Sequence, residues 1–168
     1  MAWERHLEHW IVGLRVGWLN WIFIGLSWIG TLGAVWLAIA VVLALLWRRP
    51  SIVAAVLAAD AVADLLATAG KALVHRHRPF ETQLGPASST HSFPSGHTAT
   101  SFACAAVLSV FAPRLRVPLF LLATLIGLSR IYNGMHYPTD VLAGAVLGVL
   151  TALLLRAVGP RLARRVRR

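Results

Sequence analysis

The sequence is poor in charge: only 13% of its 168 residues are charged, just six are acidic, and 58% are hydrophobic. A soluble domain of this size exposes a large share of its surface to water, so it could not bury that many apolar side chains. The composition therefore excludes an ordinary soluble domain. It predicts that lipid is the solvent for most of the chain.

Cysteine and lysine are almost absent, with Cys104 and Lys71 as their only representatives. A lone cysteine in an apolar run forms no internal disulfide, so it says nothing about the redox compartment. The sequence has no internal repeat and no low-complexity segment, and its start lacks the basic stretch and cleavage site of a secretory signal. We expect a single domain over residues 1–168.

The net charge is +10, a balance that often indicates nucleic-acid binding. Here no soluble basic region remains once the apolar segments are set aside. Membrane topology and anionic lipid headgroups explain the excess better. We therefore expect the bilayer, and no nucleic acid, as a partner, while the oligomeric state stays open.

The sequence contains five long apolar runs. Each run is close to the ~20 residues that cross a bilayer as a helix, although the third run is short. We therefore expect an all-α integral membrane bundle of about five transmembrane helices. The expected spans are residues 28–47, 52–74, 97–112, 117–134 and 139–157.

The N-terminal stretch, residues 4–22, has a different pattern. Leucine, isoleucine and tryptophan recur there at helical spacing, while Glu4 and Glu8 fall mostly on other faces. This pattern predicts an amphipathic helix that lies in the membrane interface, with tryptophan at headgroup level. The alternative is that the stretch begins a long first span, which makes six spans possible.

The distribution of arginine predicts the orientation. Five spans leave ten arginines on the side of the C-terminus and six cationic residues on the other side. The positive-inside rule then makes the C-terminus of a multi-pass cell-membrane protein cytoplasmic, so that the loop over residues 75–96 faces outward. The ten are Arg48, Arg49, Arg114, Arg116, Arg156, Arg161, Arg164, Arg165, Arg167 and Arg168.

Three polar blocks interrupt the apolar runs on the outer side: KALVHRHRP, PSGH and SRIYNGMHYPTD. Each block lies where an expected span meets an outer loop, so the three can converge on one site. Two histidines and one carboxylate could hold a metal, but three nearby cations would repel a metal and suit a phosphate. The candidate residues are Lys71, Arg78, Ser95, Gly96, His97, Arg130, His136 and Asp140.

The residue types suggest chemistry as well as binding. Gly96 lets a ligand approach the backbone at the start of a helix, where free N–H groups bind phosphate oxygens. A histidine oriented by a carboxylate serves as a nucleophile or base, and a second histidine can protonate a leaving group. Asp140 follows His136 by four residues near the start of the last span, within plausible hydrogen-bond reach of its imidazole.

Taken together over residues 71–140, the three blocks resemble the signature of the type 2 phosphatidic acid phosphatase superfamily. That superfamily also includes vanadium haloperoxidases and soluble acid phosphatases. All fixed positions of the pattern match in order, and the flanking helices resemble those of small bacterial membrane members. With five spans, the chain would lack the first of the six spans common among them, which affects the lipid entrance rather than the chemistry.

The resemblance implies a metal-free hydrolase without a cofactor. His136 would attack phosphorus to form a phosphohistidine, Asp140 would orient it, and His97 would protonate the leaving oxygen and later activate water. The substrate would be a phospholipid or a polyprenyl (pyro)phosphate, with undecaprenyl pyrophosphate, phosphatidylglycerophosphate and phosphatidic acid as candidates. The phosphoryl oxygens would be held by Lys71, Arg78, Ser95, the Gly96 amide and Arg130.

Two other functions stay open. The same histidine could pass its phosphate to another lipid, or the cationic pocket could only hold a headgroup in a transporter or binding protein. Asp60 and Asp64 in the second span slightly favour the last option, because acidic residues at membrane depth are expensive, although they can also hydrogen-bond to neighbouring helices. We expect loop, headgroup or solvent positions for His75, Arg76, His77 and His91.

Overall fold

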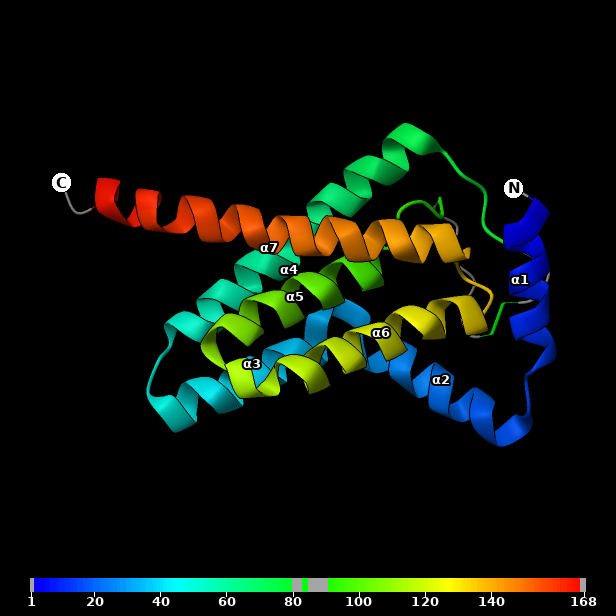
Figure 1. The fold of residues 1–168 in the computed structure, drawn as a ribbon, viewed down its shortest axis with the longest axis horizontal. Helices are drawn as coiled ribbons and strands as arrows, with labels where there is room; N and C mark the ends of the chain where they lie inside the picture. Colours follow the sequence, from blue (N-terminus) through cyan, green and yellow to red (C-terminus); the bar gives the residue numbers. More distant parts are fainter. Residues whose placement is uncertain (1, 80–82, 85–90, 167–168) are drawn as a thin grey trace.

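The structure is a computed structural model that describes residues 2–79, 83–84 and 91–166. Every regular element within these residues is a helix, so the expected all-α bundle is confirmed. The α-helices are α1 (Ala2–Gly13), α2 (Gly17–Ile29), α3 (Ala34–Trp47), α4 (Ser51–Val74), α5 (Gly96–Phe111), α6 (Arg116–Tyr132) and α7 (Pro138–Val166). Two short 3-10 helices, η1 (Thr31–Gly33) and η3 (Pro113–Leu115), precede α3 and α6 (Figure 1).

Helices α4, α5 and α6 follow the expected spans closely, whereas α7 begins where expected but runs to Val166, beyond the expected end at residue 157. Three of them, α4, α6 with η3, and α7 as far as Val158, are each long and apolar enough to cross a bilayer. Helices α3 and α5 are also apolar but shorter, with 14 and 16 residues. The expected span 28–47 is wrong over its first residues, because Gly33 has a φ of 65° and precedes the first residue of α3. A left-handed φ suits glycine and breaks a right-handed helix.

The N-terminal stretch forms two helices, whereas the sequence predicted one over residues 4–22. Helices α1 and α2 are bent 119° apart. The backbone of Val16 is extended at the break, with a φ of −132°. In Figure 1, α1 crosses the end of the bundle where α6 leads into α7, and α2 turns back along the bundle. The break follows from local backbone geometry, which the apolar spacing of the stretch does not reveal.

Helix α1 keeps the amphipathic pattern predicted for the N-terminus. Trp3, Leu7 and Trp10 are exposed on its outer face, by 51%, 37% and 62%. Glu4 and Glu8 are each only 2% exposed. The helix therefore turns its acidic face toward the bundle and leaves an apolar, aromatic face outside.

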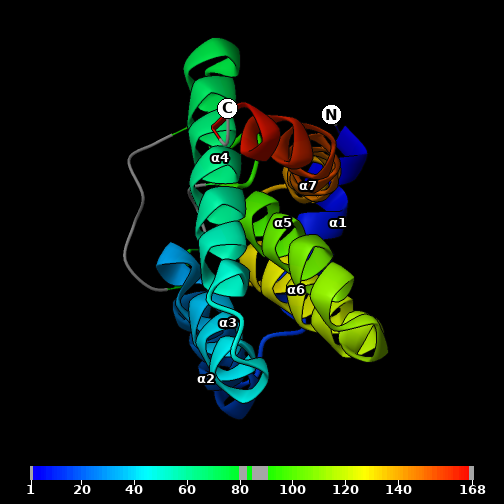
Figure 2. The ribbon, with the colours of Figure 1, turned by 90° about the vertical axis from the view of Figure 1, so that its left-hand side faces the viewer.

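Helix α5 lies in the middle of the bundle, against α4, α6 and α7 (Figure 2). Small residues allow this close approach. A Cβ atom added to Gly144 of α7 would lie 2.5 Å from the carbonyl oxygen of Ser95 and 3.0 Å from the Cβ of Thr98. Helices in lipid associate through such tight packing of small residues. As a result, the first turns of α5 and α7 are held side by side.

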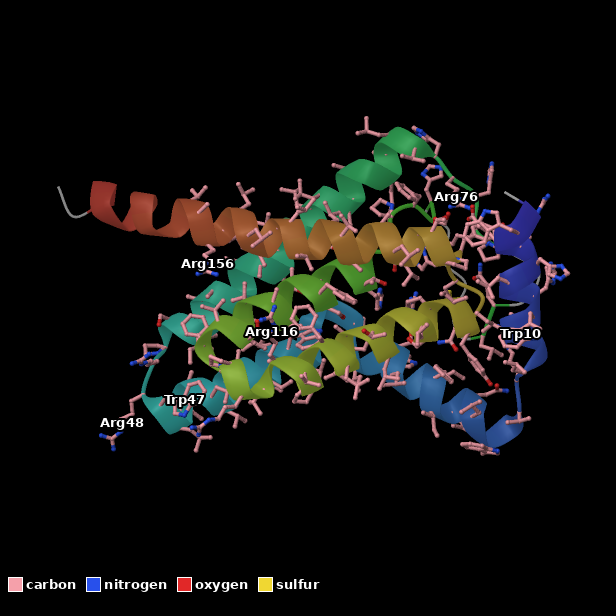
Figure 3. All side chains as sticks on the ribbon, viewed as in Figure 1. Trp10, Trp47, Arg48, Arg76, Arg116 and Arg156 are labelled. Atoms are coloured by element: carbon pink, nitrogen blue, oxygen red, sulfur yellow. The ribbon has the colours of Figure 1, made fainter. Side chains whose placement is uncertain are left out.

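Charged side chains separate toward the two ends of the bundle (Figure 3). Arg48 and Arg116 lie toward the end that carries Trp47, whereas Arg76 and Trp10 lie at the opposite end. The end with Arg76 is also where α4 finishes and where α5 and α7 begin. All three polar blocks of the sequence therefore lie at one end of the bundle.

Candidate active site

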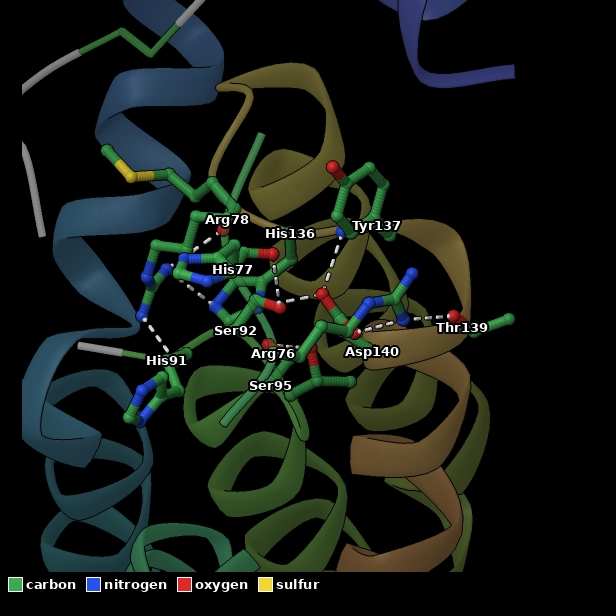
Figure 4. Close-up of polar contacts among 12 residues, drawn as sticks. Arg76, His77, Arg78, His91, Ser92, Ser95, His136, Tyr137, Thr139 and Asp140 are labelled. Carbon is green, nitrogen blue, oxygen red and sulfur yellow. Dashed lines mark hydrogen bonds and ion pairs between the residues drawn. The ribbon is translucent and has the colours of Figure 1, made fainter. Parts of the chain in front are cut away.

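The three blocks meet at the bundle end that carries Arg76 (Figure 4). Arg78 lies four residues after the end of α4 in a segment without regular secondary structure. His97 lies in the first turn of α5, and His136 lies in the turn between α6 and α7. Because each residue sits at a helix end, the packing of the helices fixes their relative positions.

His136 and Asp140 form a buried pair. Nδ1 of His136 lies 3.6 Å from Oδ2 of Asp140, and the two side chains are 2% and 0% exposed. The carboxylate is itself held, because Oδ2 accepts a hydrogen bond of 2.9 Å from the backbone N–H of Tyr137. The backbone of Asp140 is tied to the PSGH block, since the N–H of Ser95 donates to its carbonyl at 3.0 Å. Such a histidine–carboxylate separation is longer than a hydrogen bond, and catalytic hydrogen bonds are often long in sites without a bound substrate.

Arg78 fixes the tautomer of His136. Its Nη1 donates to Nε2 of His136 at 3.2 Å and to the carbonyl oxygen of Met135 at 2.9 Å, while Nη2 donates to the carbonyl of His91 at 3.3 Å. A guanidinium has only donors, so Nε2 must present its lone pair, and the proton of the neutral ring lies on Nδ1, toward Asp140. Nε2 is therefore the nitrogen available as a nucleophile.

Burial keeps His136 neutral. It lowers the pKa of the imidazole to about 4, Arg78 and Arg130 push the pKa in the same direction, and Asp140 opposes them. A neutral imidazole at physiological pH has the lone pair that nucleophilic attack on phosphorus requires. The site is thus poised for nucleophilic chemistry before any ligand binds.

His97 contacts the N-terminal part of the chain. Its Nε2 lies 3.4 Å from Oγ1 of Thr31, which donates its own proton to the carbonyl of Ser27 at 3.0 Å. The hydroxyl of Thr31 can therefore only accept from His97, which places a proton on Nε2 of that ring. His97 is half-buried, so it retains the access that a proton donor needs.

The remaining candidates form a cationic lining. Lys71, Arg78 and Arg130 all interact electrostatically with His97. A Cβ atom added to Gly96 would lie 3.2 Å from Nζ of Lys71, so this glycine leaves room for the ammonium group. The cationic groups gathered here outnumber the two nearby carboxylates, Asp140 and Asp64, and this excess of positive charge favours an anionic ligand.

Ser95 and Arg130 are both buried members of this group. Ser95 is buried, and its Oγ accepts a hydrogen bond of 2.9 Å from Thr98. Arg130 is 7% exposed and donates to the hydroxyl of Ser27. Among the described residues, Nε of Arg130 is buried without a hydrogen-bond partner, and an unsatisfied buried donor is costly unless a ligand completes it.

Arg76 is the residue that sequence reasoning placed wrongly. The sequence suggested a headgroup or solvent contact, but Nη1 of Arg76 donates to Oδ1 of Asp140 at 2.7 Å and Nη2 donates to Glu4 at 2.5 Å. Glu4 and Arg76 are 72 positions apart and share no motif or periodicity. No pattern in the sequence could have linked them.

His75, His77 and His91 lie in the loop region as expected. The rings of His75 and His91 pack edge to face, with centroids 4.7 Å apart. His91 and His77 contribute backbone carbonyls, which accept from Arg78 and Ser92 respectively. His91 therefore supports the site through its main chain rather than through its imidazole.

The two acidic residues of α4 lie at different depths. A Cβ atom on Gly33 would lie 2.5 Å from Oδ1 of Asp60, and one on Gly96 would lie 3.8 Å from Oδ1 of Asp64. Asp64 is therefore at the edge of the cationic lining, near Lys71, and Asp60 is one turn farther from it. Within the described part of the chain, Oδ1 of Asp60 is buried and has no hydrogen-bond partner.

Several known proteins are similar to this chain in sequence or in fold. The chain is 37% identical to the bacitracin transport permease protein BcrC of Bacillus licheniformis over 106 residues, which are 60% of this chain and 52% of that protein. It is 28% identical to an undecaprenyl-diphosphatase of Sulfolobus acidocaldarius over 155 residues, covering 87% of this chain and 75% of the other. The chain spans between 20% and 56% of the length of several other curated relatives.

A solved structure is similar over nearly the whole chain. It is the crystal structure of a transmembrane PAP2-type phosphatidylglycerolphosphate phosphatase from Bacillus subtilis, with a TM-score of 0.78 and 26% identity, covering 95% of this chain and 86% of that one. The family model of the PAP2 superfamily matches residues 50–164, which include all eight candidate residues. This match covers well over half of the sequence. The chain is a membrane protein that belongs to the PAP2 superfamily.

Proposed function

We propose that the chain acts as one domain, over residues 1–168, and hydrolyses a phosphomonoester or pyrophosphate of a membrane lipid. The observation that carries this proposal is the placement of His136, whose Nε2 accepts from Arg78 while its Nδ1 faces Asp140 at 3.6 Å. A neutral imidazole with an oriented lone pair beside a cationic lining is the arrangement that nucleophilic attack on a phosphate needs.

The phosphoryl group would bind in the cationic lining. Arg78 would turn its donors from Nε2 of His136 to a phosphoryl oxygen, which frees the nucleophile as the substrate arrives. Arg130 would satisfy its unpaired Nε in the same way. Charge that develops on the transferring group would be met by Lys71, Arg78, Arg130, the Ser95 hydroxyl and the N–H of Gly96 at the start of α5.

The reaction would proceed in two displacements. In the first, Nε2 of His136 forms a bond to phosphorus, the bond from phosphorus to the lipid oxygen breaks, and His97 gives that oxygen a proton. Asp140 accepts the hydrogen bond from Nδ1–H and stabilises the positive charge that develops on the ring. In the second, His97 removes a proton from water, the water oxygen bonds to phosphorus, and the N–P bond breaks to release phosphate and restore His136.

A lipid is the proposed substrate because apolar helices surround the site. The names of two related proteins, an undecaprenyl-diphosphatase and a phosphatidylglycerolphosphate phosphatase, support a polyprenyl pyrophosphate or a glycerophospholipid. The arginine distribution supports a site on the outer face of the cell membrane and a cytoplasmic C-terminus. Undecaprenyl pyrophosphate, phosphatidylglycerophosphate and phosphatidic acid are therefore the substrates to test.

Phosphate release by the detergent-purified protein tests the function. Each of the three lipids is offered with excess EDTA, beside a His136→Ala variant of the same purity. We expect release that survives EDTA and is lost in the variant, and the fastest lipid indicates the substrate class. Release that needs a divalent metal, or that persists in His136→Ala, would refute the proposal. Transfer of phosphate to an added lipid alcohol in place of release would favour the phosphotransferase.

A further inference from the structure

Arg76 links helix α1 to the reacting pair. Its Nη2 donates to Oε2 of Glu4 at 2.5 Å, and its Nη1 donates to Oδ1 of Asp140 at 2.7 Å. Thr139 closes the ring, because its hydroxyl accepts from Nη1 of Arg76 and donates to Oε2 of Glu4, both at 2.7 Å. The guanidinium also lies over the ring of Tyr137, 4.4 Å from its centroid. Figure 4 shows Arg76 reaching Asp140 and Thr139.

The two carboxylates in this network are buried, and the partly exposed guanidinium lies between them. Glu4 is 2% exposed, Asp140 is 0% exposed, and Arg76 is 24% exposed between them. Buried charges are retained only when they are paired, and removing one partner leaves the others uncompensated. The guanidinium of Arg76 bridges the two carboxylates, so the state of one carboxylate affects the other.

The position of Asp140 gives this coupling a chemical consequence. Asp140 uses Oδ1 for Arg76 and keeps Oδ2 for the side that faces His136. If Glu4 lost its charge, the full positive charge of Arg76 would act on Asp140. The carboxylate would then attract Nδ1–H of His136 less strongly and stabilise less of the positive charge that develops on the ring.

Glu4 comes from outside the part of the chain that the family model matches, residues 50–164. It lies on α1, whose opposite face carries the exposed side chains of Trp3, Leu7 and Trp10. Aromatic and apolar side chains on such a face suit the headgroup layer of a membrane. The network therefore joins an interfacial helix to the reacting residues.

We propose that Glu4 is a positioning residue for the reaction, and that it acts through Arg76 on the Asp140 carboxylate. The proposal rests on the proposed function, because it assigns Glu4 to the attack by His136. Glu4 does not touch the phosphate, so its effect belongs to the catalytic step and not to substrate binding.

The test compares two variants of α1, each of which removes the charge of one equally buried carboxylate. Glu4→Gln keeps the size of the side chain and a hydrogen-bond acceptor but removes the charge. Glu8→Gln makes the same change at the other buried carboxylate of α1. With the fastest lipid, we expect Glu4→Gln to lower kcat by about 10- to 100-fold, the range found for partners that orient reacting groups, with KM changed by no more than about twofold. Glu8→Gln should stay within about threefold of wild type.

A double-mutant cycle then asks whether Glu4 acts through Arg76. If it does, adding Glu4→Gln to Arg76→Gln costs little further kcat, because the pathway is already broken. Binding of inorganic phosphate, measured by isothermal titration calorimetry, should be unchanged in Glu4→Gln, which shows that the cationic lining is intact.

Several results would overturn the proposal. One is a kcat of Glu4→Gln equal to that of the wild type, and another is an equal loss of kcat in Glu8→Gln. A third is a double variant in which the separate losses of kcat from Glu4→Gln and Arg76→Gln multiply. Failure of the proposed function is a separate result, seen as no turnover by the wild-type protein, and it would remove the positioning role as well.

Discussion

At the scale of the residue, His136 is defined by what faces each of its two nitrogens. Arg78 donates to Nε2 and Asp140 faces Nδ1, so the ring has one competent tautomer without any ligand. Attack by Nε2 also requires a neutral ring, and burial provides this because it disfavours the imidazolium in the resting site. The same burial makes the imidazolium of the attacking state dependent on Asp140, and therefore on the Arg76 network.

The lowered pKa of His136 has a measurable consequence. The folded pKa is about 4 and the ordinary value is 6.5. Above pH 6.5 the residue is neutral in both the folded and the unfolded chain. Between pH 6.5 and about 4 the unfolded chain binds a proton that the folded chain does not, so this residue makes the protein less stable as the pH falls. We expect nuclear magnetic resonance titration of labelled histidine, assigned with His136→Gln, to give a midpoint near 4. A midpoint near 6.5 would contradict the tautomer and burial argument.

The eight candidate residues could be predicted from the sequence because they fall at fixed spacings at the ends of apolar runs. Residues with fixed spacing at helix ends converge whenever the helices pack side by side. The support from Glu4 and Arg76 could not be predicted, because it depends on how α1 lies across the end of the bundle. The same applies to Thr31 and its contact with His97, which comes from the turn between α2 and α3.

At the scale of the element, apolar length predicted where the helices from α4 onward begin and end to within about two residues, except at the C-terminal end of α7. Helix α7 runs to Val166, whereas the expected span ended at residue 157. Apolar length failed at the breaks near Val16 and Gly33, because a break is set by a few backbone dihedrals that leave the hydrophobic pattern unchanged. The apolar pattern also did not reveal which helices touch. The contact between α5 and α7 depends on Gly144 and Gly148. A hydropathy pattern does not show that these two positions must be glycine for the helices to pack closely.

Gly144→Ala tests this contact. The added Cβ would lie 2.5 Å from the carbonyl oxygen of Ser95, so α7 must move away from α5 at the level of the site. We expect overpacking to cost about 1–3 kcal/mol, partly offset by the higher helix propensity of alanine, and phosphate release to fall. Gly25→Ala is the matched control, since nothing lies within 4 Å of a Cβ added there. Thermal unfolding in detergent measures both variants, and equal melting temperatures for the two would contradict the packing argument.

At the scale of the whole molecule, the distribution of charge follows the long axis of the bundle. Arg48 and Arg116 lie toward one end and the polar site at the other (Figure 3), as the order of the apolar runs predicted. By the positive-inside rule this separation sets the orientation of the bundle in the membrane. The orientation in turn determines which leaflet of the membrane supplies the lipid substrate.

The orientation can be tested with single cysteines in a Cys104→Ser background. His77→Cys places an exposed thiol beside the site, and Arg156→Cys places one on α7 near the opposite end. An impermeant maleimide added to intact cells, with the outer membrane opened where there is one, should label His77→Cys. Arg156→Cys should react only after the cell membrane is permeabilised. The reverse pattern would place the site on the cytoplasmic face.

Nucleophilic attack by His136 on phosphorus is tested most directly by trapping the covalent phosphohistidine intermediate. The protein is mixed with a lipid whose terminal phosphate carries a radioactive label, denatured in alkali within the first turnover, and digested to locate the label. We expect phosphate on His136, stable to alkali and labile to acid, and no labelled phosphate in His136→Gln. Label on any other residue, or full turnover by His136→Gln, would contradict it.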